Sequence, residues 1–175
     1  MKNTVYIISG PAGVGKSTTS KSLVQRLARS AYVSGDDISH IPVNGRGKPW
    51  LDRDTYELTW KNILSITKNL LDYHYDIVID YVAFPEDAHR LATELSTRDV
   101  RIVYVVLLVD KETIVQRDQL RPRAWQMGER SVILLDEFES HPELTTSHKL
   151  YTNEMQEEQL PDIIEMIINQ DKFIL

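Results

Sequence analysis

Cysteine is absent from this sequence of 175 residues, and long apolar runs are absent as well. A chain without cysteine has no disulfide scaffold, thiolate zinc site, iron–sulfur cluster or cysteine nucleophile, and a reducing compartment suits it. The longest apolar run, at 102–109, is far shorter than the roughly 20 residues of a membrane-spanning helix. We therefore expect a cytoplasmic protein without a membrane span.

Positive charge is also limited, since 20 Lys and Arg residues stand against 26 Asp and Glu residues and the formal net charge is −6. This balance argues against a general nucleic-acid surface or anionic-membrane surface, although a local basic patch is compatible with it. The length is close to one average domain, and no stretch has the composition of a linker or repeat. We expect a single domain over residues 1–175, and the sequence carries no signal for an oligomeric state.

Short runs rich in valine, isoleucine and tyrosine alternate with amphipathic patterns along the chain. Asp54 and Glu57 resemble a helix capping box, and Pro85 suits a first helical turn. Nearly continuous apolar strands alternating with helices are typical of a parallel sheet covered by helices on both faces. The predicted strands are 4–9, 31–34, 76–80, 100–109 and, more weakly, 149–151; the predicted helices are 16–29, 54–71, 85–96, 111–120, 131–139 and 161–169.

Residues 10–17 fit the phosphate-loop pattern G-x-x-x-x-G-K-[ST], and they stand between a predicted strand and a predicted helix, as that pattern requires. Glycines let backbone amides point at a triphosphate, Lys16 adds charge at the β- and γ-phosphates, and Ser17 can ligate Mg²⁺. The sequence therefore predicts MgATP as the ligand. The predicted nucleotide-binding residues of this segment are Gly10, Pro11, Ala12, Gly13, Val14, Gly15, Lys16, Ser17 and Thr18.

Other features separate the classes of P-loop protein. The sequence has no N-K-x-D guanine-reading motif and no ABC-type signature, and its length leaves little room for the helical lid domain of AAA+ ATPases. Over nearly its whole length it resembles the small P-loop kinases, which include nucleoside-monophosphate, shikimate and gluconate kinases and chloramphenicol phosphotransferase. This resemblance implies a three-layer α/β/α P-loop NTPase fold with a five-stranded parallel sheet in the order 2-3-1-4-5.

Carboxylates follow two of the predicted strands. Asp36 and Asp37 end a segment in which such kinases place a carboxylate beside the acceptor hydroxyl, and residues 34–40 and 48–51 resemble the G-D-x-x-H and K-P-W-L segments of gluconate kinases. The resemblance implies Asp36 as the base; the alternative is local turn chemistry. Asp80 ends a strand that resembles a Walker B strand, which implies a Mg²⁺ role, the alternative being a helix cap.

Arginines gather around residues 117–131, where the resemblance implies a mobile lid that brings positive charge onto the phosphates. Arg117 and Arg121 are four residues apart, so we expect them on one helix face, at a hinge before Pro122. Both are predicted to act in catalysis, with Arg121 also contacting the nucleotide. The alternative is a solvated surface with ordinary arginines, and this holds equally for Arg123 and Arg130.

The loop within residues 35–53 is the predicted acceptor-binding segment, because Arg46, Lys48 and Arg53 gather around Trp50 in an otherwise acidic chain and would suit an anionic acceptor. Surface loops also carry such charges for solubility alone. Thr152 and Asn153 occupy the region where these kinases pack the adenine base. In contrast to gluconate kinases, which have a Ser- and Arg-containing segment after the third strand, residues 80–85 are largely apolar and aromatic, so we do not expect sugar-acid specificity to carry over.

These observations predict an enzyme that moves the γ-phosphoryl group of MgATP to a hydroxyl of a small-molecule acceptor. A nucleotide kinase or nucleic-acid-end kinase is the second hypothesis, although the net charge disfavours a polynucleotide. The third is a non-catalytic regulatory module in which ATP orders the lid for a partner.

Overall fold

One parallel sheet organises the computed structural model, which describes residues 2–153 and 157–175. The predicted strand order is confirmed as β2-β3-β1-β4-β5, including the weakly predicted fifth strand. The central strand β1 pairs Ile8 with Asp80 of β3 and Ser9 with Val106 of β4, so the carboxyl ends of these strands lie at one edge. The strands are β1 (Asn3–Ser9), β2 (Ser30–Ser34), β3 (Asp76–Asp80), β4 (Val100–Leu108) and β5 (Lys149–Tyr151).

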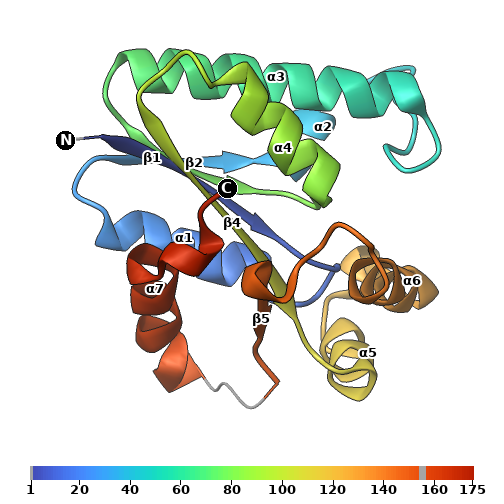
Figure 1. The fold of residues 1–175 in the computed structure, drawn as a ribbon. Helices are drawn as coiled ribbons and strands as arrows, with labels where there is room; N and C mark the ends of the chain where they lie inside the picture. The colour runs from blue at the N-terminus through green and yellow to red at the C-terminus, as the bar shows by residue number, and fades with distance from the viewer. Residues whose placement is uncertain (1, 154–156) are drawn as a thin grey trace.

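Helices cover both faces of the sheet, which confirms the three-layer α/β/α architecture (Figure 1). Helices α3 and α4 lie on one face and α1 and α7 on the other, while α5 and α6 lie beyond the carboxyl end of β4. No helix among residues 2–153 and 157–175 is long and apolar enough to cross a membrane. The helices are α1 (Lys16–Arg26), α2 (Gly35–Ser39), α3 (Arg53–Asp72), α4 (Pro85–Glu94), α5 (Lys111–Gln119), α6 (Glu129–Glu139) and α7 (Leu160–Asn169), with short 3₁₀ turns η1 (Arg123–Trp125), η2 (Thr146–His148), η3 (Glu157–Gln159) and η4 (Asp171–Phe173).

The core follows the apolar strands. Ile7 of β1, Ile79 of β3 and Val105 of β4 are fully buried, because helices cover both sides of these parallel strands. Between α3 and α4, the carboxylate of Asp87 accepts hydrogen bonds from the Tyr56 hydroxyl and, at 3.0 Å, from the Phe84 amide. These contacts fix the start of α4 against α3, on the side of the sheet where the chain leaves β3.

The start of α3 differs from the sequence prediction. The N-cap is Asp52, whose Oδ2 accepts a hydrogen bond of 3.3 Å from the Thr55 amide. The predicted capping box at Asp54 is therefore wrong. Asp52 has an extended backbone, as an N-cap requires, whereas Asp54 already lies within the first helical turn. The helix consequently begins one residue before the expected start.

Residues 35–39 form the short helix α2, not the local turn that was the alternative interpretation of this segment. Ser34 caps it by accepting a hydrogen bond of 3.1 Å from the Asp37 amide. Gly35 is required by close approach, because a Cβ atom there would lie 2.2 Å from Cγ of Tyr81. The start of α2 therefore packs directly against Tyr81, the residue that follows β3, and Asp36 lies at the same edge of the sheet as Asp80.

Candidate functional site

The phosphate loop leaves β1 and enters α1 at the carboxyl edge of the sheet, where nucleotides bind in open α/β folds. Gly10 has φ of 134°, and a Cβ atom there would lie 2.3 Å from the carbonyl oxygen of Leu107 in β4. A residue other than glycine would therefore move the loop away from the sheet. Gly15 occupies the N-cap of α1 and brings no capping side chain, so the first amides of α1 are free to face an anion.

Lys16 lies at the centre of the predicted site. Its Nζ donates a hydrogen bond of 2.9 Å to the carbonyl oxygen of Pro11, within the loop itself. Burial lowers the pKa of Lys16, the carboxylates of Asp80 and Asp36 act in the opposite direction, and Arg121 lowers it further. Residues from the phosphate loop, β3, α2 and the segment after α5 are thus close enough to influence one ammonium group.

Asp80 ends β3 and is only 6% exposed. Its Oδ2 accepts a hydrogen bond of 2.7 Å from the Tyr32 hydroxyl, and that hydroxyl also interacts with the Ser17 side chain. Burial, together with the adjacent carboxylate, raises the pKa of Tyr32, so the phenol remains a protonated donor. Asp80 does not cap a following helix, because α4 begins only at Pro85.

The donors around Asp80 fit a magnesium ion. Mg²⁺ prefers oxygen ligands, keeps several of its waters and is usually held by one or two protein groups together with substrate phosphates. The Ser17 hydroxyl and the Asp80 carboxylate, both contacted by Tyr32, are oxygen donors of this kind. Within the described part of the chain, no cluster of three or more His, Asp or Glu side chains offers a cage built from protein ligands alone.

Asp36 and Asp37 occupy the first turn of α2. Within the described residues the Asp36 carboxylate accepts no hydrogen bond, and Ser34 provides the helix cap instead. Asp36 is exposed to solvent on one side, but the protein atoms around its carboxyl group raise its pKa, while Lys16 opposes this change. Asp36 and not Asp37 is among the charges that act on Lys16, which places Asp36 nearer to the phosphate loop.

Arg117 and Arg121 have different surroundings. Arg117, in α5, donates hydrogen bonds of 3.0 Å to the carbonyl of Val14 and 3.3 Å to the carbonyl of Thr152. Arg121 lies beyond the end of α5, so the expectation that both arginines share one helix face is wrong. The helix ends early because Pro122 disfavours helical backbone at the residue before it. Arg121 instead lies 3.5 Å from Asp118.

Asp118 is a residue that sequence reasoning missed. Its carboxylate is buried and accepts hydrogen bonds from the amides of Met127, at 3.0 Å, and Gly128, at 2.8 Å, in addition to its contact with Arg121. It therefore closes the segment between α5 and α6 into a loop. Burial alone would raise the pKa of Asp118, but these amide donors together with Arg121 outweigh it and lower the pKa.

We expect Asp118→Ala to lower the free energy of unfolding by about 1–3 kcal/mol at pH 7, because the change leaves the two amides without their acceptor. Since the folded-state pKa is lowered, this stabilisation is present above the ordinary Asp value of about 3.9 and is lost as the pH falls through the folded-state value. Urea unfolding at pH 7 and pH 3 measures it. Asp136→Ala, at an exposed position of α6, is the control; an equal effect of both variants would contradict the assignment.

The predicted acceptor loop is partly tied to α2. Arg46 donates hydrogen bonds of 2.6 Å and 3.1 Å to the carbonyl and hydroxyl oxygens of Ser39, so this arginine anchors the loop. Trp50 is 46% exposed, with Lys48 Nζ 5.7 Å and Arg130 Cζ 5.8 Å from its ring centroid. A shallow groove of about 400 Å³ lies here, lined by Pro49, Trp50, Leu51, Asp52, Arg53, Tyr56 and Glu57.

Thr152 and Asn153 follow β5 at the same edge of the sheet. The Thr152 amide donates 2.9 Å to the carbonyl of Leu108, and Asn153 hydrogen-bonds to both the amide and the carboxylate of Asp110. Through Arg117, the Thr152 carbonyl is also linked to the phosphate loop. These contacts order the region in which the adenine contact was predicted.

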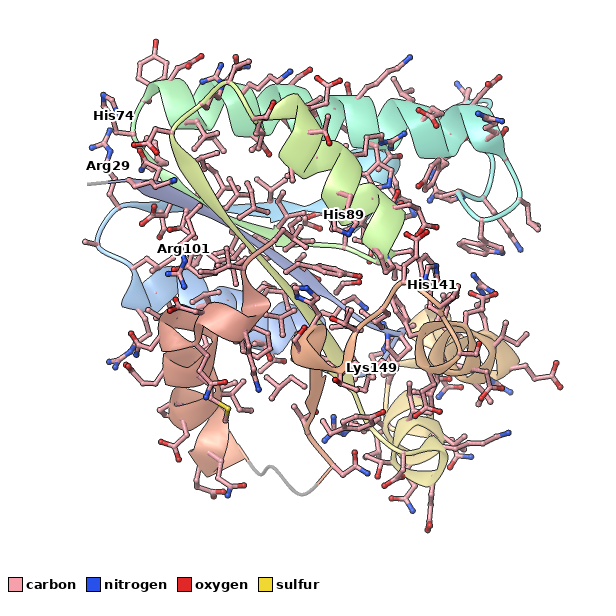
Figure 2. All side chains as sticks on the ribbon, in the orientation of Figure 1. Arg29, His74, His89, Arg101, His141 and Lys149 are labelled. Carbon is pink, nitrogen blue, oxygen red and sulfur yellow. The ribbon has the colours of Figure 1, made fainter. Side chains whose placement is uncertain are left out.

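The segment after β3 is apolar and packed. Tyr81 lies edge-on to Trp60 at a centroid distance of 5.6 Å, and Phe84 stacks on Phe138 of α6 at 4.3 Å. His141, which follows α6, stacks on Phe84 and places Nε2 3.2 Å from Glu86 of α4 (Figure 2). The far end of α6 is therefore anchored to α4, and the aromatic side chains at 81–84 serve the core.

Comparisons with known proteins agree with this geometry. The chain is 23% identical over 177 residues to a protein of Schizosaccharomyces pombe described as a probable gluconokinase, covering 96% of this chain and 91% of that protein. The fold is similar to a gluconokinase from Sinorhizobium meliloti (TM-score 0.63, 18% identity, covering 93% and 87% of the two chains). It is also similar to the APS kinase of Mycobacterium tuberculosis (TM-score 0.67, 15% identity, covering 96% and 99%) and to a tunicamycin resistance protein of Deinococcus radiodurans (TM-score 0.67, 16% identity, covering 96% and 96%).

A family model described as an AAA domain matches residues 5–135. The match contains the phosphate loop, Asp36, Asp80 and the arginines after β4, which are the positions that the sequence singled out. After β5, the described residues form only η3, α7 and η4, which is too little for a separate helical lid domain of the AAA+ type. The chain belongs to this AAA domain family, as a P-loop kinase domain.

Proposed function

We propose that this protein is an ATP-dependent phosphotransferase that moves the γ-phosphoryl group of MgATP to a hydroxyl of a small-molecule acceptor. One observation carries the proposal: the phosphate loop with Lys16, Asp80 at the end of β3 and Asp36 at the start of α2 lie at the same carboxyl edge of the sheet, and Asp80, Asp36 and Arg121 are all close enough to influence the pKa of Lys16. Phosphoryl transfer needs positive charge on the phosphates, a carboxylate for the metal and a carboxylate for the attacking hydroxyl, all within one site. These charges converge here from four separate segments of the chain.

The proposed roles follow from position. Lys16 and the amides of residues 10–18 hold the β- and γ-phosphates, and Asp36 accepts the proton of the attacking hydroxyl. Arg121 neutralises charge on the transferring group, whereas Arg117 braces the phosphate loop against the Thr152 region. Catalysis is then mainly positioning and charge stabilisation.

Ser17 and Asp80 would hold Mg²⁺, which supplies charge neutralisation on the phosphate oxygens when it is bound. Residues 1–175 form one kinase domain in this proposal, with an acceptor loop over 35–53 and a lid over 117–131. Asp37, Trp50 and Arg53 complete the acceptor side, Arg46 anchors that loop to α2, and Thr152 and Asn153 contact the adenine.

We propose a small-molecule acceptor and do not assign a sugar acid in particular. The gluconokinase relative is 23% identical, which is too distant to transfer its substrate. At the place where gluconate kinases carry Ser and Arg, Tyr81 and Phe84 pack against Trp60 and Phe138. The side chains of this segment are therefore committed to the core rather than to a polar acceptor.

A screen for acceptor-stimulated ADP release tests the proposal. The panel contains sugar acids, nucleosides, nucleotides, amino alcohols, and aminocyclitol and phenicol antibiotics, each with MgATP. We expect at least one small hydroxyl compound to raise ADP release well above the background. Stimulation by oligonucleotide ends would favour a nucleic-acid-end kinase, and background ATPase alone would favour a regulatory module.

Arg121→Ala tests the lid. We expect kcat to fall by on the order of 10² or more with little change in ATP affinity, because an arginine that stabilises transition-state charge affects rate more than ground-state binding. Steady-state kinetics with a stimulating acceptor measures this. Arg98→Ala removes a surface arginine paired with Asp72, on the far side of the molecule from the loop, and serves as the control. A rise in the KM for ATP with unchanged kcat would refute the role.

A further inference from the structure

Tyr32 has a place in the site that neither the phosphate-loop pattern nor the carboxylate pattern indicated. It lies in β2, two residues before the strand ends, and its side chain is partly exposed. Its hydroxyl donates a hydrogen bond of 2.7 Å to Oδ2 of Asp80 and also interacts with the hydroxyl of Ser17. Tyr32 is thus hydrogen-bonded to Asp80 and lies close to Ser17, the two residues that are proposed to hold the metal.

The hydrogen bond to Asp80 is not forced by burial of the tyrosine. A buried phenol must find a partner within the protein, but a partly exposed one can use water. The Asp80 carboxylate, by contrast, requires a hydrogen-bond donor, because it is 6% exposed and a buried charge without hydrogen bonds is costly. A carboxylate has two oxygens; the tyrosine satisfies Oδ2, and among the described residues no hydrogen bond to Oδ1 is seen.

The bond also fixes orientation. Hydrogen bonds to an ionised carboxylate are short and stronger than neutral ones, so this contact restricts rotation of the Asp80 side chain. Ser17 belongs to α1 and Asp80 to β3, and the Ser17 side chain lies close enough to the same hydroxyl to influence its pKa. Metal-binding carboxylates are generally held by such outer hydrogen bonds, and loss of one typically costs 10–100-fold in metal affinity.

We propose that Tyr32 is a positioning residue that orients Asp80 and Ser17 for magnesium bound with the nucleotide. This inference rests on the proposed function, because it concerns the metal of that same site. Tyr32 contacts neither the nucleotide nor the acceptor in this scheme and acts only through the two metal ligands. Its effect is therefore confined to the part of nucleotide affinity that depends on Mg²⁺.

Tyr32→Phe separates this role from simple packing, because it keeps the ring and removes only the hydroxyl. Isothermal titration with a non-hydrolysable ATP analogue, in EDTA and at a series of Mg²⁺ concentrations, gives the metal-dependent part of the affinity without relying on turnover. We expect affinity in EDTA to stay within about twofold of wild type, and the Mg²⁺ concentration for half-maximal enhancement to rise roughly 10–100-fold.

Tyr104→Phe is the matched control, because it also removes a hydroxyl that donates within the protein, here 2.8 Å to the carbonyl of Ala83. We expect its Mg²⁺ dependence to match wild type. Unchanged Mg²⁺ dependence in Tyr32→Phe, or an equal loss of affinity with and without metal, would overturn the role of Tyr32 and leave the proposed function standing. A wild-type protein whose nucleotide affinity does not respond to Mg²⁺ would overturn both.

Discussion

We expect Lys16→Ala to abolish ATP turnover and to weaken MgATP binding sharply while the protein still folds. Lys16 is the first residue of α1, where alanine is a good helix former, and its Nζ makes a single hydrogen bond within the loop, to Pro11. Little folding energy therefore depends on it. Its charge is the protein's main cation at the loop, so its loss removes the stabilisation of the β- and γ-phosphates.

Isothermal titration with MgATP and an ADP-release assay measure this effect, and circular dichroism checks the fold. Lys68→Ala is the control, since Lys68 pairs with Glu94 on the outside of the molecule, 3.0 Å away. Its nucleotide affinity and turnover should match wild type. Wild-type affinity and turnover in Lys16→Ala would refute the assignment of the phosphate loop.

Asp36→Asn gives the second large effect, a fall in phosphoryl transfer of roughly 10²–10⁴-fold, the range that general-base catalysis supplies. Asparagine keeps the size of the side chain and removes its charge. The fold should tolerate the change, because Ser34 caps α2 and the described structure shows no hydrogen bond to the Asp36 carboxylate. Nucleotide affinity should barely change, because Asp36 is proposed to face the acceptor.

The raised pKa of Asp36 adds a pH signature. The protein atoms around the carboxyl group raise this pKa although the residue is exposed on its surface, so the base becomes protonated, and activity falls, at a higher pH than for an ordinary aspartate. Asp37→Asn is the internal control, since Asp36, unlike Asp37, is among the charges that influence the pKa of Lys16. A large loss at Asp37 with none at Asp36 would overturn the residue assignment, and no loss at either would remove both from the mechanism.

The phosphate loop and the sheet order were predictable from the sequence because their signals are local. Residues 10–17 form one continuous string, and the strands are apolar runs whose alternation with helices determines the layers. The position of Asp80 could be recognised in the same way, since it directly ends such a run. Even the short strand at 149–151 was recognisable by its position in this alternation.

Contacts between distant segments were not predictable in the same way. Tyr32 and Asp80 are 48 residues apart, and nothing in the composition around Tyr32 distinguishes it from a core tyrosine. Asp118 resembles a surface residue of a helix until the chain folds back and places the amides of 127 and 128 against it. The sequence also did not distinguish between nearby residues of the same type. At the start of α3, both Asp52 and Asp54 could serve as the N-cap, and the structure shows that Asp52 does.

The central claim is transfer of a phosphoryl group from ATP to an acceptor hydroxyl, and phosphorus NMR tests it most directly. The wild-type protein is incubated with MgATP and the strongest acceptor from the screen, and the fate of the γ-phosphate is followed. We predict a new phosphate-ester signal that grows in step with ADP and is absent for Lys16→Ala. Inorganic phosphate as the sole product, with the acceptor unchanged, would contradict the account.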